Sequence, residues 1–207
     1  MLVCKACFKT HNPASLFTML DSDSPLCDSC LSSMSRRIHF RKMDGFTCIC
    51  LGDYSGGAKD LLHRYKEQKD YELRSVFLYP FSSLISSLFH SCVVTWAPSS
   101  PGKLKQRGFD HMEGICQSLR LEHKPLLAKD DGLEQKVSNR EERLTVGERI
   151  HIASVATLPK KVLLIDDVVS TGGTLNACYK TLKESGAKKV YALVLMDNTI
   201  KTEKKQP

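Results

Sequence analysis

Several common sequence patterns are missing from this chain, and each absence excludes a class of protein. The N-terminal residues 1–4, Met-Leu-Val-Cys, are not a basic segment followed by an apolar one, so we do not expect secretion. No Gly-x4-Gly-Lys-Ser/Thr loop occurs, which argues against a P-loop NTPase. A Gly-x-Gly-x-x-Gly turn is also absent, which argues against a dinucleotide-binding fold. We find no internal repeat and no low-complexity segment apart from the lysine-rich residues 201–207, which we expect to be disordered.

A long uninterrupted apolar run is missing as well. Residues 76–101 contain no Asp, Glu, Lys or Arg, but serines and Pro80 interrupt them, and a membrane-spanning helix needs about 20 apolar residues. Apolar residues at positions 81, 84, 85, 88 and 89 predict instead a one-sided helix, followed by a strand at residues 93–97. The sequence therefore predicts no membrane span and a cytoplasmic protein.

The composition is that of a folded protein with a moderate excess of positive charge. A chain of 207 residues with 42% apolar content can bury the core of one full domain and hold a small one besides. Its net charge of +7 favours anionic partners such as nucleotides, nucleic acid or phosphosugars. Part of the excess lies in the C-terminal tail, residues 201–207, which carry three lysines and one glutamate, so net charge alone does not identify the partner.

Cysteine is abundant, and its spacing predicts a metal site. Of the nine cysteines, four form two Cys-x2-Cys pairs, Cys4 with Cys7 and Cys27 with Cys30. Four thiolates complete a tetrahedral zinc site, and so small a segment cannot otherwise bury enough apolar surface to hold its shape. We predict a structural zinc ion here, because four thiolates leave no position open for a catalytic water. Unliganded or redox-active thiols are the alternative.

Residues 162–175 form the most informative stretch of the chain. Residues 162–165 are all aliphatic, as in a strand buried on both faces of a parallel sheet. Asp166 and Asp167 follow at the end of this strand, and a loop of hydroxyl and glycine residues then leads into a predicted helix that ends near Ser185. Backbone N–H groups of such a loop and the helix dipole favour a phosphate, and carboxylates accept hydrogen bonds from sugar hydroxyls. The stretch predicts a site for a phosphorylated sugar.

Strands and helices alternate from Tyr54 onward, which predicts an α/β fold with a parallel sheet. We expect a helix from Ser55 through Tyr65, mostly helical structure over residues 70–88, a helix over residues 112–119, a short strand over residues 151–155 and a last strand over residues 190–195. Residues 98–111 read as a loop whose three cations, Lys103, Lys105 and Arg107, could neutralise a pyrophosphate at the ligand-binding edge of the sheet. A solvated basic loop is the alternative.

Three further segments leave two interpretations open. Residues 135–143 are a mobile lid or an exposed helical turn. Cys48 and Cys50 would share one face of a strand over residues 47–54, as spare metal ligands or, in our preferred interpretation, as small core residues. Residues 36–42 place basic side chains around Phe40, either to grip a nucleic-acid backbone or as a solvated helix face.

The adjacent carboxylates decide how the stretch is interpreted. A tight turn with an acidic helix cap would explain Gly172 and Thr174 without any ligand. It would not explain Asp166 beside Asp167, because the mutual repulsion of two carboxylates costs stability unless something uses them. A ligand site is therefore the better interpretation.

These motifs together resemble those of a known family. Residues 165–174, Ile-Asp-Asp-Val-Val-Ser-Thr-Gly-Gly-Thr, are similar to the phosphoribosyl-pyrophosphate (PRPP) motif of type I phosphoribosyltransferases. The cysteine pairs, residues 66–70, the triplet Arg-Gly-Phe at 107–109 and residues 135–143 accompany it in the same order as in the ComF/GntX family. The resemblance extends over nearly all of residues 1–200.

The resemblance implies a fold and a domain organisation. The fold would be α/β, a type I phosphoribosyltransferase-like parallel sheet flanked by helices, with a small N-terminal zinc ribbon held by four cysteines. The ribbon would occupy residues 1–46, the phosphoribosyltransferase-like domain residues 47–200 and the disordered tail residues 201–207.

The resemblance also implies roles for single residues. The phosphoribosyl group would be bound by Asp166, Asp167, Val168, Ser170, Thr171, Gly172, Gly173 and Thr174. In this arrangement the acidic pair binds the ribose hydroxyls, the loop cradles the 5′-phosphate, and Mg²⁺ bridges pyrophosphate and ribose oxygens. The side chains facing pyrophosphate or DNA would be Lys103, Lys105, Arg107 and Arg143, and the catalytic residues Asp166, Asp167 and Arg107.

Family members are linked to natural competence, in which imported single-stranded DNA is drawn into the cytoplasm. The implied partners are PRPP or a nucleotide, single-stranded DNA, and a competence helicase or other DNA-uptake proteins. The implied place is the cytoplasm, with a peripheral position at the inner face of the membrane as a further expectation.

Two departures from the family pattern bear on catalysis. Asp110 and His111 stand where the family usually has Asn-Gln, and a carboxylate there would oppose a pyrophosphate; Val146 replaces a common Asn. Both weigh against turnover more than against phosphate binding. Our first hypothesis is a competence protein that binds phosphoribose and single-stranded DNA. The alternatives are an active phosphoribosyltransferase with an unidentified base or amine acceptor, and a ribbon that docks proteins.

Overall fold

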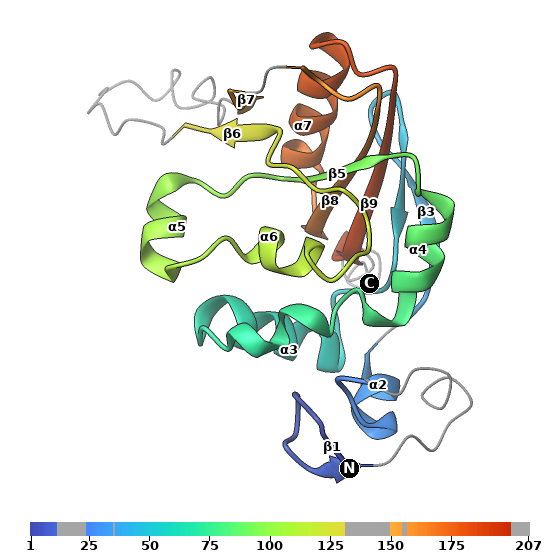
Figure 1. The fold of residues 1–207 in the computed structure, drawn as a ribbon, viewed down its shortest axis with the longest axis vertical. Coiled ribbons are helices and arrows are strands. Elements are labelled where there is room, and N and C mark those ends of the chain that lie inside the picture. The colour runs from blue at the N-terminus through green and yellow to red at the C-terminus, as the bar shows by residue number, and fades with distance from the viewer. Residues whose placement is uncertain (12–23, 35, 131–149, 155–156, 200–207) are drawn as a thin grey trace, which may run out of the picture.

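A computed structural model describes residues 1–11, 24–34, 36–130, 150–154 and 157–199 (Figure 1). Its centre is a five-stranded sheet with the strand order β3-β4-β9-β8-β5. The members are β3 (His39–Lys42), β4 (Thr47–Cys50), β9 (Lys189–Asp197), β8 (Lys161–Val169) and β5 (Val93–Trp96). β4, β9, β8 and β5 run parallel, and β3 pairs antiparallel with β4 at one edge. The predicted α/β fold with a parallel sheet is confirmed, and an antiparallel edge strand is added to it.

The strand predicted at residues 162–165 is buried on both faces. Leu163 and Ile165 belong to one hydrophobic core, whereas Val162 and Leu164 belong to a second core on the other side of the sheet. This alternation follows from the two-residue period of a strand. β8 lies between β9 and β5, so its backbone is paired on both sides, and the residues that follow it start from a rigid element.

Helices cover both faces of the sheet (Figure 1). The first core takes in buried residues of α3 (Gly56–Glu67), α6 (His111–Cys116) and the 3₁₀ helix η1 (Tyr71–Ser75), and the second takes in those of α7 (Gly173–Glu184). The helices expected from residue 55 and after residue 172 are confirmed. The first core is thus the larger one, and it also reaches the N-terminal segment.

The region predicted to be mostly helical over residues 70–88 is broken into short pieces. They are η1, the 3₁₀ helix η2 (Tyr79–Phe81) and α4 (Ser82–Leu88). Pro80 explains the break, because proline removes a backbone donor and restricts the residue before it. On α4 the side chain of Ile85 is buried, but those of Leu84 and Leu88 are exposed, so the apolar face expected for this helix is covered in part.

The N-terminal cysteine segment packs onto α3. It contains β1 (Leu2–Val3), paired with β2 (Thr10–His11), and α2 (Asp28–Ser33). Leu26 and Leu31 belong to the same core as Leu61 and Leu62 of α3. Arg64 of α3 donates a hydrogen bond of 2.6 Å to the backbone oxygen of Ala6. The segment and the central sheet therefore share one continuous core.

A second small sheet lies beside the C-terminal ends of the parallel strands. β6 (Leu127–Lys129) pairs antiparallel with β7 (Ile150–Ile152), which confirms the strand expected near residue 151. The segment that separates them in sequence contains residues 135–143, expected to be a mobile lid or an exposed helical turn, and these lie outside the described residues. In the parts of the chain that the structure describes, no helix has both the length and the apolar character required to cross a bilayer.

Candidate functional site

A pocket opens at the C-terminal ends of β5 and β8, the edge of a parallel sheet where ligands usually bind. It is lined by residues 97–100 after β5 and by residues 166–175, which run from the end of β8 into the start of α7. The other lining side chains come from four different elements: Lys66 of α3, Lys103 and Arg107 of α5 (Pro101–Arg107), His111 of α6 and Lys129 of β6. The pocket therefore brings the predicted acidic pair and loop together with a ring of cationic groups.

Asp167 is held by donors on both of its carboxylate oxygens. Its Oδ2 accepts hydrogen bonds from Lys66 Nζ at 2.6 Å and His111 Nε2 at 2.7 Å, and its Oδ1 accepts one from the backbone N–H of Val168 at 2.6 Å. Charge-assisted bonds of this length are among the strongest in proteins. Asp167 is therefore fixed in place and links the end of β8 to α3 and α6.

His111 connects Asp167 to Arg107. Its Nδ1 lies 2.8 Å from Arg107 Nη1, and because a guanidinium can only donate, Nδ1 accepts this bond. The ring proton then resides on Nε2, which donates to Asp167 Oδ2. Arg107 is itself buried, and its Nε donates to the backbone oxygen of Lys66 at 3.2 Å. This relay orders the cationic wall of the pocket before any ligand enters.

The two adjacent carboxyl groups differ in their proton affinity. Burial, together with the charge of Asp167, raises the pKa of Asp166 to about 8. Burial acts in the same direction on Asp167, but the hydrogen bond from His111 and the charge of Lys66 outweigh it and lower the pKa of that carboxyl below its usual range. Asp167 is thus ionised at neutral pH, whereas Asp166 loses its proton readily once a cation or a hydrogen-bond donor arrives.

The loop after β8 leads directly into a helix N-terminus. Gly172 has φ +84°, a left-handed conformation that glycine adopts without strain, and α7 begins at Gly173. A Cβ at Gly172 would overlap the Cε of Met43, so the tight turn and the close approach of Met43 both favour glycine. Because the first N–H groups of a helix have no partner within it, this loop can receive a phosphate.

The predicted cationic residues are only partly brought together. Lys103 and Arg107 line the pocket, Lys105 is exposed and does not line it, and Arg143 lies outside the described residues. The segment predicted as a loop over residues 98–111 is wrong in part, because residues 101–107 form α5. Pro101 at its first turn suits a helix start, and Gly108 in the left-handed conformation ends it.

Asp110, the carboxylate expected to oppose a pyrophosphate, is engaged by hydrogen bonds within the protein. Its Oδ1 caps α6 by accepting bonds from the backbone N–H groups of Met112 and Glu113, at 2.9 and 3.3 Å. Its Oδ2 accepts a bond of 2.9 Å from Trp96 Nε1. These bonds hold the carboxylate in a structural role, and Asp110 does not line the pocket.

Three pocket residues were missed by the sequence reasoning, Lys66, His111 and Lys129. His111 stood out only as a departure from the family pattern, and its contact with Arg107 joins the end of α5 to the start of α6. Lys66 is 101 positions from Asp167 in the sequence and meets it through the packing of α3 on the sheet. Lys129 is the last residue of β6, a strand that the sequence did not predict.

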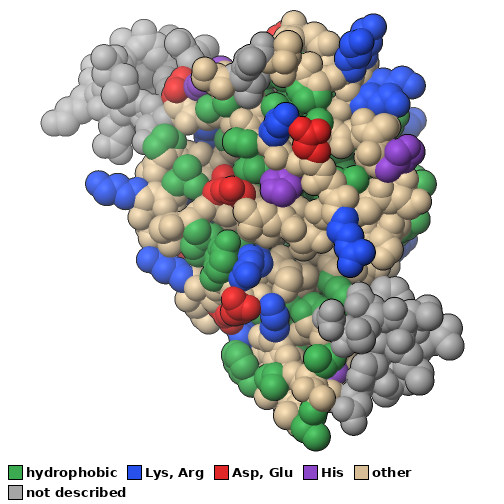
Figure 2. All heavy atoms as spheres, in the orientation of Figure 1, with side chains coloured by type: hydrophobic (Ala, Val, Ile, Leu, Met, Phe, Trp, Pro, Cys, Tyr) green, Lys and Arg blue, Asp and Glu red, His purple; other side chains and the backbone are tan. Residues whose placement is uncertain are grey.

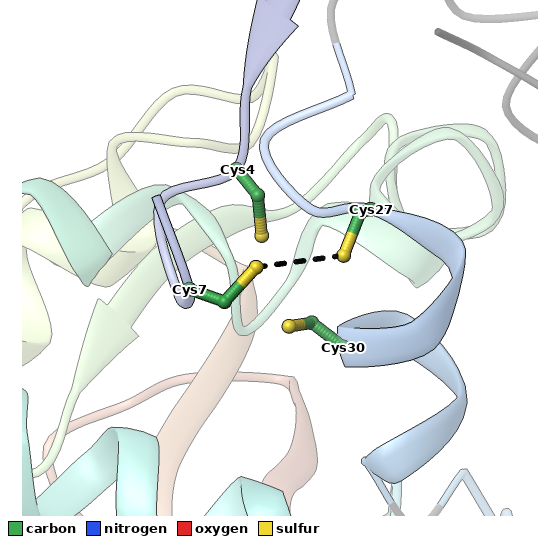
Figure 3. Close-up of side chains that lie close together, drawn as sticks. All are labelled: Cys4, Cys7, Cys27 and Cys30. Atoms are coloured by element: carbon green, nitrogen blue, oxygen red, sulfur yellow. Dashed lines mark hydrogen bonds between the residues drawn. The ribbon is translucent and has the colours of Figure 1, made fainter. Parts of the chain in front are cut away.

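Four sulfur atoms converge in the N-terminal segment (Figure 3). The Sγ atoms of Cys4, Cys7, Cys27 and Cys30 all lie within 4.8 Å of one another, and those of Cys7 and Cys27 are 3.8 Å apart. Thiolates about 2.3 Å from a shared zinc ion, arranged tetrahedrally, are separated by about 3.8 Å. The four cysteines therefore fit a structural zinc site.

Comparisons with known proteins agree with these features. Residues 133–207 match the family model of the phosphoribosyl transferase domain. The chain is 31% identical over 204 residues to the competence protein ComFC of Streptococcus pneumoniae, covering 88% of this chain and 92% of that protein. It is 30% identical over 150 residues to an adenine phosphoribosyltransferase of Gluconobacter oxydans, covering 67% of this chain and 83% of that protein.

The chain is also similar to solved structures of phosphoribosyltransferases and of a larger enzyme. A hypoxanthine phosphoribosyltransferase from Staphylococcus aureus is 13% identical with a TM-score of 0.39, over 61% of this chain and 64% of that chain. The allosteric regulatory enzyme of purine biosynthesis is 17% identical with a TM-score of 0.40, over 59% of this chain. The match spans 26% of the length of that enzyme.

Proposed function

The chain belongs to the ComF/GntX family of competence-associated, phosphoribosyltransferase-like proteins, and on this premise we propose that its pocket binds a phosphoribosyl group. The ligand would be PRPP or a nucleotide 5′-phosphate, including the end of a DNA strand. The observation that supports this most is the differently held acidic pair, with Asp167 fixed by Lys66 and His111 and Asp166 beside it.

Each part of such a ligand has a matching part of the pocket. The loop of residues 170–174 and the N-terminus of α7 would receive the 5′-phosphate. Asp166 would accept hydrogen bonds from the ribose hydroxyls, and Lys103 and Arg107 would face the pyrophosphate. Asp167 would act mainly by positioning Lys66 and His111.

Mg²⁺ would accompany PRPP, because this cation prefers carboxylate and phosphate oxygens. The acidic pair supplies such oxygens, so the residues present fit the ion. When bound, Mg²⁺ neutralises pyrophosphate charge. The raised pKa of Asp166 implies that this carboxyl gives up a proton when PRPP binds together with Mg²⁺.

A competition experiment tests the proposal. Trp96 is the single tryptophan of the chain, and it ends β5 next to Ala97 of the pocket wall. We expect its fluorescence to change in a saturable way when PRPP and Mg²⁺ are added. Ribose 5-phosphate and pyrophosphate should each compete with PRPP, and each should bind more weakly than PRPP, which contacts both halves of the pocket.

Two results would contradict it. If ribose 5-phosphate does not displace PRPP, the assignment of the loop and the acidic pair fails. If pyrophosphate does not compete, the assignment of Lys103 and Arg107 fails. An unphosphorylated ribose serves as the negative control, because it lacks the group that the loop would hold.

Single-stranded DNA is the second ligand in this proposal. β3 is an edge strand, Phe40 on it is 74% exposed, and the side chains of Arg36, Arg37 and Lys42 around it are also exposed. Arg41 of the same strand donates a bond of 2.6 Å to the backbone oxygen of Ser170, so β3 borders the phosphate loop. Bases could stack on Phe40 while the cations contact the backbone. On the face drawn in Figure 2, Lys and Arg side chains occur at several separate places.

We therefore expect single-stranded DNA to bind with an affinity that falls steeply as salt rises. Replacing Phe40 with alanine should weaken binding by about 1–3 kcal/mol, the usual loss for one stacked base. Leu88→Ala removes another exposed apolar side chain, which lies on α4 and not on β3, and should have no effect. Fluorescence anisotropy of a labelled oligonucleotide measures both variants; equal affinities would remove Phe40 from the interface.

Transferase activity is a second candidate function, favoured by the likeness to an adenine phosphoribosyltransferase and by the cations around the pocket. An acceptor nitrogen would attack the anomeric carbon, and the C–O bond to pyrophosphate would break with its electron pair leaving on oxygen. Lys103 and Arg107 would stabilise that charge. Release of pyrophosphate with adenine or a panel of bases and amines would support turnover; binding of PRPP without any release would leave the chain a binding protein.

A further inference from the structure

A second group of metal-ligating side chains lies at the β3 edge of the central sheet, outside the pocket. His39 of β3, Cys50 of β4 and Asp197 at the end of β9 each place one ligand atom within 4.8 Å of the other two. His39 and Cys50 are directly paired in the antiparallel register of β3 and β4, and β4 is paired with β9. Three backbone strands thus fix the relative positions of the three side chains.

The distances are close to those between ligands of one zinc ion. His39 Nε2 lies 3.1 Å from Asp197 Oδ2, and Cys50 Sγ lies 4.0 Å from the same oxygen. Nitrogen, oxygen and sulfur ligands arranged tetrahedrally around zinc are separated by about 3.3–3.8 Å. Cys48 Sγ, 3.8 Å from Cys50 Sγ, is the nearest further sulfur.

The hydrogen bonds of His39 favour a metal ligand. Its Nδ1 is 3.0 Å from the backbone oxygen of Arg37, and because a carbonyl can only accept, Nδ1 carries a proton. The lone pair of a neutral ring is then on Nε2, which faces Asp197 Oδ2. Two acceptors in contact require a cation between them, either a second ring proton or a metal ion. A histidine that donates from Nδ1 to a backbone carbonyl is the usual orientation of a zinc ligand.

Asp197 is oriented in the same manner. Its Oδ1 accepts bonds from Arg41 Nη1 at 3.1 Å, the backbone N–H of Thr199 at 2.9 Å and the hydroxyl of Thr199. Its Oδ2 faces His39 and Cys50. One oxygen is therefore anchored by donors while the other is presented to the cluster, as in the supporting shell of many metal sites. The carboxylate and the sulfur are both buried, so an unbalanced charge there would be costly.

We propose that His39, Cys50 and Asp197 bind a zinc ion, separate from the one expected at the N-terminal cysteines. The mixture of imidazole, thiolate and carboxylate ligands suits zinc better than Mg²⁺ or Ca²⁺, which prefer oxygen alone. One thiolate and one carboxylate neutralise its charge. The ion would fasten β3 to β4 and β9, and through Arg41, which contacts both Asp197 and Ser170, it would brace the phosphate loop.

Zinc content of the full chain tests the proposal. After equilibration with Zn²⁺ and removal of loosely bound metal, the wild-type chain should retain two zinc ions. His39→Gln and Asp197→Asn should each retain one, because each removes a ligand of the second site and leaves the four cysteines intact. His90→Gln, which changes an exposed histidine bound to the backbone oxygen of Ser87, is the matched control and should retain two.

Substitution with Co²⁺ gives an independent readout. The difference between the visible spectra of the wild type and His39→Gln should contain a tetrahedral cobalt band with weaker sulfur-to-metal charge transfer than a four-thiolate site gives. One zinc ion in the wild type would overturn the proposal and leave His39 and Asp197 as an ion pair. Two zinc ions in both ligand variants would overturn it as well. Because the wild-type count alone can reject the site, the conclusion does not depend on how well a variant folds.

Discussion

Replacing Asp166 and Asp167 together with asparagine should weaken the binding of PRPP with Mg²⁺ by roughly a hundredfold or more. A hydrogen bond to a charged group contributes about 1.5–3 kcal/mol, and the double substitution removes at least two such interactions. Asparagine keeps the shape of each side chain, so the loss reports charge rather than packing. Asp60→Asn is the control, since Asp60 lies exposed on α3 and does not line the pocket.

The single variants Asp166→Asn and Asp167→Asn should differ in which ligands they bind more weakly. The carboxylate of Asp167 holds Lys66 and His111 in place. Asp167→Asn should therefore make these side chains more mobile and weaken the binding of pyrophosphate as well as that of PRPP. Asp166→Asn should weaken the binding of ribose 5-phosphate and of PRPP but leave the affinity for pyrophosphate nearly unchanged.

The raised pKa of Asp166 provides a further distinction between the two variants. Because a bound ligand favours the ionised carboxylate, its pKa falls on binding, and the wild type should release a proton below pH about 8. Calorimetry in buffers of different ionisation enthalpy measures this release, which Asp166→Asn should abolish. Proton release that persists in Asp166→Asn would place the titrating group elsewhere.

The other large effect is expected at the N-terminal cysteines. Cys27→Ser removes one of four converging ligands, and zinc binding supplies on the order of 10 kcal/mol of folding free energy in small four-ligand zinc peptides. We expect loss of one zinc ion and rapid proteolysis within residues 1–34. Because Leu26 and Leu31 belong to the same core as Leu61 and Leu62, the melting temperature of the whole chain should also fall.

A matched control separates zinc loss from a simple loss of cysteine. Cys92→Ser replaces a buried cysteine that belongs to neither metal-ligating cluster. It should keep its zinc and resist proteolysis. A Cys27→Ser chain with unchanged zinc content and unchanged protease resistance would contradict a structural zinc ion at this place.

The features that depend on local sequence could be predicted. Residues 162–165 are continuously aliphatic, and the structure buries them on both faces of the sheet. The glycines at 172 and 173 indicated a tight turn before a helix, and α7 begins there. In both cases the pattern lies within one element, so the strand, the turn and the placement of the acidic pair followed from it.

The features that depend on packing between distant elements could not be predicted. Asp110 looked like a repulsive carboxylate, but its partner Trp96 lies on another element, and together they give it a structural role. The contact of Lys66 with Asp167 arises because α3 crosses the end of β8. Cys50 looked like a small core residue, and it is buried, but its neighbours His39 and Asp197 come from two other strands.

The most direct measurement is a calorimetric titration of PRPP with Mg²⁺ into the wild-type chain, with the Asp166→Asn/Asp167→Asn double variant and Asp60→Asn titrated under the same conditions. If the pocket at the end of β8 binds a phosphoribosyl group, the wild type and Asp60→Asn should bind one PRPP per chain with the same affinity, and the double variant should bind it with an affinity lower by roughly a hundredfold or more. Absence of binding by the wild type, or equal binding by the double variant, would contradict that conclusion.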